Sequence, residues 1–106
     1  MIVVNRFRVP EAEQASFRED LERARAALAV QSGFIAGRIG RNVDDPELWV
    51  LTTEWEGPGA YRRALSAYDV KLGAVPTLSR AVDEPSAYEQ VEPGEALNVP
   101  VTRSLG

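Results

Sequence analysis

Residues 32–61 read SGFIAGRIGRNVDDPELWVLTTEWEGPGAY, and this stretch decides the fold. Its second half, residues 48–55, is rich in β-branched and aromatic side chains, as strands usually are. The turn sequence Asp44-Asp45-Pro46 separates it from an earlier run, residues 34–42, so the two runs are expected to pair as an antiparallel hairpin. Gly57-Pro58 then suits the N-cap and first turn of a helix. The stretch therefore predicts a strand, a turn, a strand and a helix in succession.

The segments on either side complete this pattern. Residues 2–9 read as a strand with apolar side chains on both faces. An amphipathic helix follows, because apolar residues recur at helical spacing at Phe17, Leu21, Ala24 and Leu28. The next helix is expected to end near Ser66, and Gly73 and Pro76 then divide or kink the helical region after it. Residues 86–91 predict a last short strand.

The order strand, helix, strand, strand, helix, strand predicts an α+β fold of the ferredoxin-like βαββαβ type, a four-stranded antiparallel sheet with both helices on one face. We expect one domain over residues 1–91 and a tail over residues 92–106 that is disordered or extends along a neighbouring subunit. The uncovered face would be too apolar to leave in water, so we expect a homodimer formed through it. Its apolar residues are Ile2, Val4, Leu48 and Val50. Charged residues offered for pairing across that interface are Arg6, Arg8, Arg38 and Glu54.

Composition excludes several kinds of chemistry. The 106 residues contain no histidine and no cysteine, which excludes an imidazole base, a thiolate nucleophile, disulfides and thiolate metal sites. The net charge of −4 and the scattered arginines argue against nucleic-acid binding, because such proteins usually gather positive charge into a patch. No apolar run approaches the length of a membrane span, and the start does not read as a signal peptide. We therefore expect a soluble cytoplasmic protein with no nucleic-acid or membrane partner.

Three landmarks stand out: Ser32-Gly33-Phe34 after the first helix, the Asp44-Asp45-Pro46 turn, and Trp55-Glu56 followed by Ala60-Tyr61. In these the chain resembles the antibiotic biosynthesis monooxygenase domain family of the dimeric α/β-barrel superfamily, over roughly residues 1–91. The resemblance implies a dimeric α/β barrel. Some members oxygenate polyketide anthrones without metal or flavin, and in them a tryptophan and a tyrosine six residues later line the substrate pocket. This implies that role for Trp55 and Tyr61, whereas Leu51 stands where those enzymes have an asparagine.

Haem-degrading members of the family offer a second comparison. In those proteins an asparagine on the first strand faces the pocket, which implies the same for Asn5. They bind iron through a histidine on the second helical segment, and this chain has no histidine. Haem degradation of that type is therefore not expected, and we predict no metal site and no cofactor.

The predicted catalytic residues are Asn5, Trp55 and Tyr61. An amide on an otherwise apolar strand face needs partners, so Asn5 either bonds other protein groups or points into a cavity at a ligand. Trp55 either packs in the core or contacts substrate. The phenol of Tyr61, with an ordinary pKa of about 10, suits a hydrogen-bond donor better than a base at neutral pH. Three more residues are predicted to bind substrate: Phe7, Leu51 and Tyr68.

These residues predict a cofactor-independent monooxygenase that acts on an aromatic, polyketide- or quinol-like small molecule. Such a substrate, once ionised, passes an electron to dioxygen itself, so the protein supplies binding, orientation and stabilisation of the developing anion. Two other functions stay open. One is a non-catalytic dimeric module that binds a small hydrophobic molecule, and the other is a cofactor-free isomerase or lyase on the same scaffold.

Overall fold

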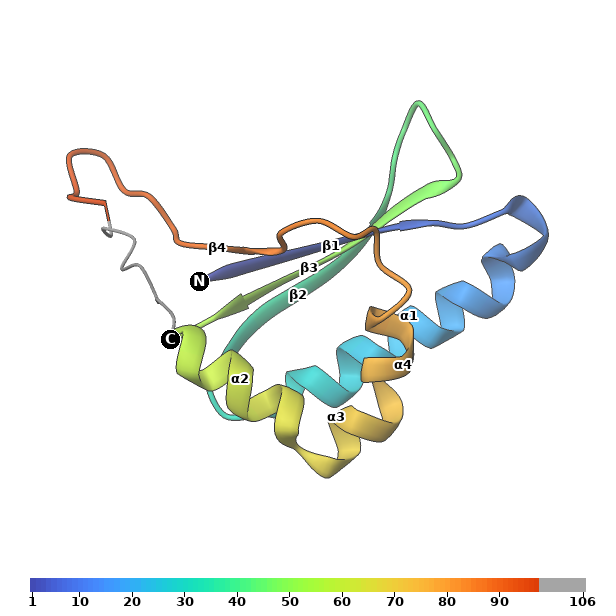
Figure 1. Cartoon of the computed structure of the whole chain (residues 1–106). Coiled ribbons are helices and arrows are strands. Elements are labelled where there is room, and N and C mark those ends of the chain that lie inside the picture. Colours follow the sequence, from blue (N-terminus) through green and yellow to red (C-terminus); the bar gives the residue numbers. More distant parts are fainter. Residues whose placement is uncertain (98–106) are drawn as a thin grey trace.

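The computed structural model describes residues 1–97, whose strands form one antiparallel sheet with the helices against one face (Figure 1). The strand order across the sheet is β2-β3-β1-β4. This order confirms the predicted ferredoxin-like α+β fold. The strands are β1 (Ile2–Arg8), β2 (Phe34–Arg41), β3 (Leu48–Trp55) and β4 (Ala87–Tyr88). The helices are the 3₁₀ turn η1 (Glu11–Glu13), α1 (Gln14–Ala29), α2 (Pro58–Ser66), α3 (Tyr68–Gly73) and α4 (Val75–Leu78).

Most element boundaries agree with the prediction, and the last strand is the exception. The helical region after α2 divides into α3 and α4 where Gly73 and Pro76 predicted a break. Strand β4 has two residues instead of the predicted 86–91. The pairing of β4 with β1 is antiparallel, and Tyr88 pairs with Ile2, the first residue of β1. Residues after Tyr88 therefore have almost no part of β1 left to pair with. Residues 92–97 of the predicted tail are exposed, and residues 98–106 lie outside the described part of the chain.

The hydrophobic core lies between the sheet and the helices. Along β3 every second side chain is buried, which is the period of a strand with one covered face. The buried face of α1 supplies Phe17, Leu21, Ala24 and Leu28, the four residues that the helical spacing singled out. Val3, Phe7, Leu51 and Trp55 are each at most 1% exposed on the covered face of the sheet. The helices therefore cover the face that the sequence predicted.

A close approach at Gly33 holds the start of α2 against the turn after α1. Gly33 has a φ of +87°, and a Cβ atom built there would lie 2.4 Å from the Cβ of Ala60. The Gly33 carbonyl also accepts a hydrogen bond from the Glu56 amide at 2.8 Å. No side chain fits at residue 33 without moving α2. This contact sets the direction in which α2 carries Tyr61 across the sheet.

The other face of the sheet carries half-buried apolar side chains, in keeping with the alternation of the strands: Ile2, Val4, Leu48 and Val50. Two arginines of β1 already have carboxylate partners in the same chain. Arg6 donates two hydrogen bonds to Glu84, 2.7 Å from Nε and 2.6 Å from Nη2, and Arg8 pairs with Asp45. Within residues 1–97 no helix is both long and apolar enough to cross a membrane.

Candidate functional site

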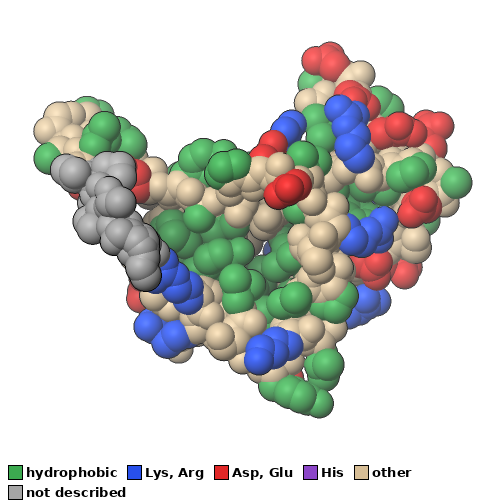
Figure 2. Space-filling view, viewed as in Figure 1, with side chains coloured by type: hydrophobic (Ala, Val, Ile, Leu, Met, Phe, Trp, Pro, Cys, Tyr) green, Lys and Arg blue, Asp and Glu red, His purple; other side chains and the backbone are tan. Residues whose placement is uncertain are grey.

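A pocket of about 430 Å³ lies between β1 and the helices α2 and α4. Figure 2 shows hydrophobic side chains gathered in a hollow between the sheet and the helices on the face turned to the viewer. This volume falls within the usual range of small-molecule sites. The lining residues are Asn5, Tyr61, Leu65, Val75, Leu78 and Ser79.

Strand alternation places Asn5 on the covered face of β1, between Val3 and Phe7. Those two neighbours are at most 1% exposed, whereas Asn5 is only half-buried because its side chain reaches the pocket. Asn5 pairs with Leu51 of the adjacent strand β3. The amide is therefore a polar group set into an apolar sheet face, at the wall of the pocket.

Helix α2 brings Tyr61 to the same pocket. Gly57 is extended and caps the helix, Pro58 occupies its first turn, and the Tyr61 amide donates to the Gly57 carbonyl at 3.3 Å. Burial raises the pKa of the Tyr61 phenol, and a side-chain hydrogen bond with Asn5 opposes this in part. The phenol is therefore protonated at neutral pH, which is the state that the predicted role of hydrogen-bond donor requires.

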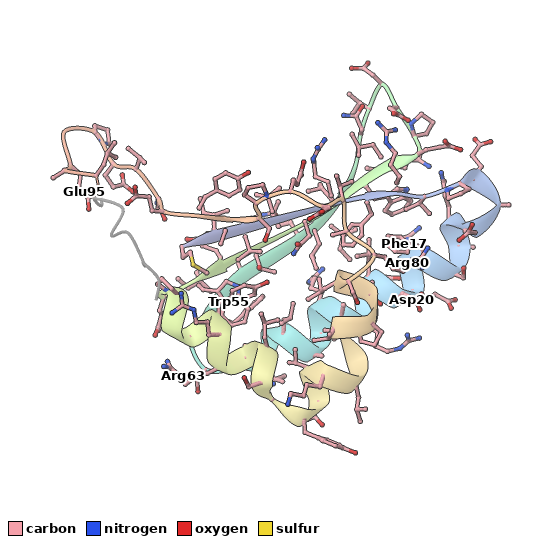
Figure 3. The ribbon with its side chains drawn as sticks, in the orientation of Figure 1. Phe17, Asp20, Trp55, Arg63, Arg80 and Glu95 are labelled. Atoms are coloured by element: carbon pink, nitrogen blue, oxygen red, sulfur yellow. The ribbon has the colours of Figure 1, made fainter. Side chains whose placement is uncertain are left out.

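Trp55 lies behind Tyr61 instead of lining the pocket. Its indole is 1% exposed and packs between the rings of Phe34 at 5.3 Å and Tyr61 at 5.5 Å, measured between centroids. The indole Nε1 donates a 2.9 Å hydrogen bond to the hydroxyl of Thr53. Figure 3 shows the Trp55 side chain in the space between the sheet and α2. Trp55 thus supports the tyrosine ring from the core.

The three residues predicted to bind substrate lie outside the pocket lining. Phe7 is 1% exposed and packs on Phe17, with ring centroids 5.1 Å apart. Leu51 is fully buried in the core. Tyr68 begins α3 and is 74% exposed. Of the six predicted site residues, the structure brings only Asn5 and Tyr61 into the wall of this pocket.

The remaining pocket walls come from residues that the sequence analysis did not single out. Leu65 follows Tyr61 by one helical turn, so the α2 stripe was a usable signal for it. Val75, Leu78 and Ser79 belong to the short helix α4 and its end, where the pattern was too brief to indicate a face. The Ser79 hydroxyl donates to the Val75 carbonyl at 2.6 Å. The other polar side chains of the pocket are those of Asn5 and Tyr61, which interact with each other.

The pocket lining offers hydrogen-bond donors and acceptors but no carboxylate, amine or guanidinium. Among residues 1–97, no three histidine, cysteine, aspartate or glutamate side chains gather in a group able to hold a metal ion. What the pocket can do on its own is bind a flat apolar molecule and direct an amide and a phenol at one polar atom of it.

The sequence profile of the family described as Antibiotic biosynthesis monooxygenase matches residues 1–73. The chain belongs to this family. No curated protein sequence matches it. SnoaB, a cofactor-independent oxygenase from Streptomyces nogalater, is 27% identical in one structure, with a TM-score of 0.68 over 87% of this chain and 95% of SnoaB. A SnoaB variant gives 26% identity and a TM-score of 0.71, over 89% of this chain and 96% of that one.

A candidate antibiotic biosynthesis monooxygenase from Deinococcus radiodurans shares the fold, at 20% identity and a TM-score of 0.69 over 95% of this chain and 100% of that one. The family match and the similarity to SnoaB support a monooxygenase-type function for this family member. They leave the substrate to be inferred from the pocket.

Proposed function

We propose that this family member is a cofactor-independent monooxygenase that binds a flat, electron-rich aromatic molecule between Asn5 and Tyr61. The observation that carries the proposal is the meeting of one amide and one protonated phenol in a pocket otherwise walled by Leu65, Val75 and Leu78. The similarity to SnoaB, a cofactor-independent oxygenase, supports the reaction class.

The walls and the polar groups suit different parts of such a substrate. Leucine and valine side chains favour aromatic rings, because burial removes apolar surface from water. The amide of Asn5 and the phenol of Tyr61 both donate to a carbonyl oxygen that becomes negative when the substrate ionises. A donor whose pKa is raised by burial stays protonated while it stabilises this oxyanion.

The reaction needs no external reductant. The ionised substrate gives one electron to dioxygen, and the resulting carbon radical and superoxide combine into a peroxide on the activated ring carbon. The peroxide then takes up a proton and loses water. In an anthrone this step turns the ring CH₂ group into a carbonyl, so one oxygen atom enters the product and the other leaves as water. All electrons come from the substrate carbon.

The first proton leaves to solvent, because the pocket lining contains no carboxylate or amine to accept it. The substrate must therefore be acidic enough to ionise near neutral pH once its oxygen is hydrogen-bonded by Asn5 and Tyr61. Anthrones and quinols have this property, because the anion is delocalised over the rings.

Oxygen uptake by the purified protein, against a panel of anthrones, quinols and catechols, tests the proposal. Tyr61→Phe and Asn5→Ala should each lower turnover about 10- to 100-fold, since each removes one donor to the developing anion. Tyr88→Phe is the matched control, because it removes a half-exposed phenol outside the pocket and should leave turnover unchanged. Turnover that survives both pocket substitutions contradicts the assignment. Saturable binding without oxygen uptake across the panel favours the non-catalytic binding module instead.

We also infer that two copies pair through the open sheet face. The half-buried side chains of Ile2, Val4, Leu48 and Val50 form an apolar surface that a second sheet would cover. Val50→Glu should convert a dimer to a monomer in light scattering coupled to gel filtration. Ala26→Glu, on the exposed side of α1, should leave the mass unchanged. A wild-type protein that runs as a monomer at micromolar concentration contradicts this inference.

A further inference from the structure

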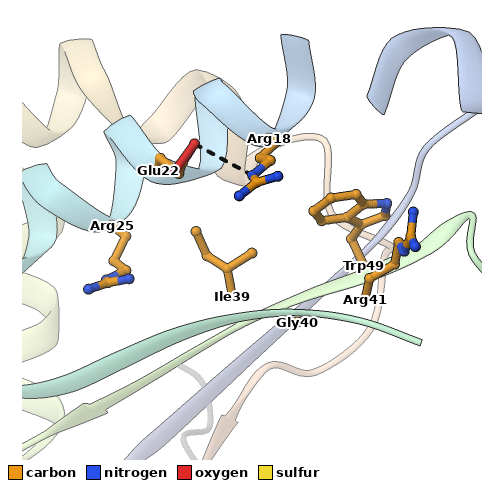
Figure 4. Close-up of a pocket in the computed structure, with 7 residues that line it drawn as sticks. All are labelled: Arg18, Glu22, Arg25, Ile39, Gly40, Arg41 and Trp49. Atoms are coloured by element: carbon orange, nitrogen blue, oxygen red, sulfur yellow. Dashed lines mark ion pairs between the residues drawn. The ribbon is translucent and has the colours of Figure 1, made fainter. Parts of the chain in front are cut away.

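A second hollow of about 440 Å³ lies between α1 and β2 (Figure 4). It shares no lining residue with the pocket of Asn5 and Tyr61. Helix α1 supplies one wall, and β2 with the first residues of β3 supplies the floor. The lining residues are Arg18, Glu22, Arg25, Ile39, Gly40, Arg41 and Trp49. We refer to it as the arginine groove.

The charge of the arginine groove is opposite to that of the chain as a whole. Three guanidinium groups and one carboxylate line it, whereas the full chain has a net charge of −4. The carboxylate of Glu22 is 3.9 Å from Nε of Arg18, beyond hydrogen-bond distance. The groove therefore has a local excess of positive charge that its own carboxylate does not neutralise.

The guanidinium donors of the groove are short of acceptors. Arg25 has no ion pair and no side-chain hydrogen bond within the described residues. Arg41 donates one hydrogen bond, at 3.1 Å, to the neutral side chain of Gln14. A guanidinium carries five N–H donors in a planar fork that matches a carboxylate or phosphate. An oxyanion is the group that would satisfy these donors.

The floor of the groove is apolar and aromatic. The indole of Trp49 is 8% exposed, and the guanidinium of Arg41 lies 5.9 Å from the centre of its ring. Figure 4 shows the six-membered ring of Trp49 directed toward Arg18 and the ring nitrogen toward Arg41, with Ile39 rising from β2 beside them. The Trp49 Nε1 atom is buried and has no hydrogen-bond partner within residues 1–97. The floor thus adds an apolar surface and one more donor without an acceptor.

The absence of a side chain at Gly37 lets Arg25 pack closely on the β2 backbone. A Cβ atom built at Gly37 would lie 3.4 Å from Cγ of Arg25 and 3.0 Å from Cζ of Phe34. The stem of Arg25 therefore packs on the β2 backbone at Gly37, and Arg25 lines one end of the groove.

We propose that the arginine groove is a second ligand site, which binds a small planar molecule that carries an oxyanion, either a carboxylate or a phosphate monoester. The anion lies against the guanidinium group of Arg25, at one end of the groove, and the flat body of the ligand rests on Ile39 and the edge of Trp49 (Figure 4). The volume, the excess of donors and the aromatic floor each point to this chemistry.

Calorimetric titration of the full chain with four probes tests the site. Benzoate and phenyl phosphate should bind saturably and more weakly as the salt concentration rises, because the contact is ionic. Benzamide, which has the shape of benzoate but no charge, should bind at least about tenfold more weakly, and so should inorganic phosphate, which lacks the flat body. The stronger of the two aromatic anions identifies the oxyanion. No saturable binding of either one, or equal binding of benzamide, overturns the proposal.

Substitutions locate the binding. Arg25→Gln should weaken benzoate and phenyl phosphate about tenfold, because it removes one charge-assisted contact, and Arg25→Lys should restore part of the loss. Arg23→Gln is the matched control, since Arg23 lies on the same helix and pairs with Asp20 outside the groove. Equal weakening by Arg23→Gln, or amide chemical-shift changes confined to the pocket of Asn5 and Tyr61, overturns the assignment. Circular dichroism on each variant checks that the fold is retained.

Discussion

The phenol ring of Tyr61 packs against the indole of Trp55, with ring centroids 5.5 Å apart and planes inclined by 52°. Trp55, at the end of β3, is buried, whereas Tyr61 of α2 lines the pocket. The indole therefore supports the tyrosine ring on the side away from the pocket. The spacing of six residues between them spans one strand-to-helix corner. The pair therefore connects the core of the protein directly to the wall of its candidate site.

The hydrogen bond from Trp55 to Thr53 should stabilise this support. Thr53→Val keeps the shape of the side chain but leaves the indole N–H buried without an acceptor, which should lower the free energy of unfolding by about 1–3 kcal/mol. Thr53→Ser retains the hydroxyl and should recover most of that loss. Urea denaturation of the three proteins measures both effects. Equal stability of the valine and serine variants would mean that the hydrogen bond contributes nothing.

Gly33 should tolerate alanine much less well than Gly94 does. Both have positive φ values, +87° and +76°, which cost a non-glycine residue about 1–2 kcal/mol. At Gly33 the new Cβ would also meet Ala60 at 2.4 Å, whereas at Gly94 nothing lies within 4 Å. Gly33→Ala should therefore lower the melting temperature clearly more than Gly94→Ala. Equal shifts would show that the contact between residue 33 and α2 is not tight.

Acid should weaken the fold partly through Glu84. The hydrogen bonds and charge of Arg6 lower the pKa of the Glu84 carboxyl below its ordinary value of 4.5. A carboxyl whose pKa is lower when folded than when unfolded stabilises the fold above the unfolded pKa, and this contribution is lost as the pH falls through the folded pKa. Glu84→Gln should therefore show a shallower fall in unfolding free energy below about pH 4.5. Denaturant titrations at several acid pH values compare the two slopes, and identical slopes would exclude this linkage.

The phenol of Tyr61 should ionise above pH 10. Burial is the cause of its raised pKa, and Asn5 offsets only part of the effect. In a spectrophotometric titration, the step that Tyr61→Phe removes should have its midpoint above the ordinary value of 10.0. Circular dichroism over the same range must show that the fold survives. A removed step at or below pH 10 would mean that the phenol is exposed to solvent.

Secondary structure was predictable wherever neighbours in the chain determine it. The limits of β3, the end of α2 and the division of the helical region near Gly73 all follow from side-chain period, capping and backbone breakers. The length of β4 was not predictable in this way, because Ile2 at the start of β1 limits the ladder. A strand ends where its partner ends, and its own residues do not reveal that position.

The site was predictable in part. Asn5 and Tyr61 were chosen from a polar residue on an apolar face and from a family resemblance, and the structure places both in one pocket wall. Contact of Phe7, Leu51 and Tyr68 with a ligand stays a prediction. None of the three lines the pocket, because Phe7 and Leu51 are buried in the core and Tyr68 is exposed elsewhere. The arginine groove carried no sequence signal, because Arg25 and Arg41 belong to different elements and only the packing of α1 on β2 brings them to one groove.

The sequence by itself determined the order of elements, the covered face of each strand and the absence of imidazole and thiol chemistry, because these depend on residue types and on spacing along the chain. The tertiary structure alone decided which side chains share a cavity. The approach of Ala60 to Gly33 directs α2, the break near Gly73 folds α4 back toward β1, and together they set the pocket around Asn5. Such relations arise from close packing between distant segments, which no local pattern records.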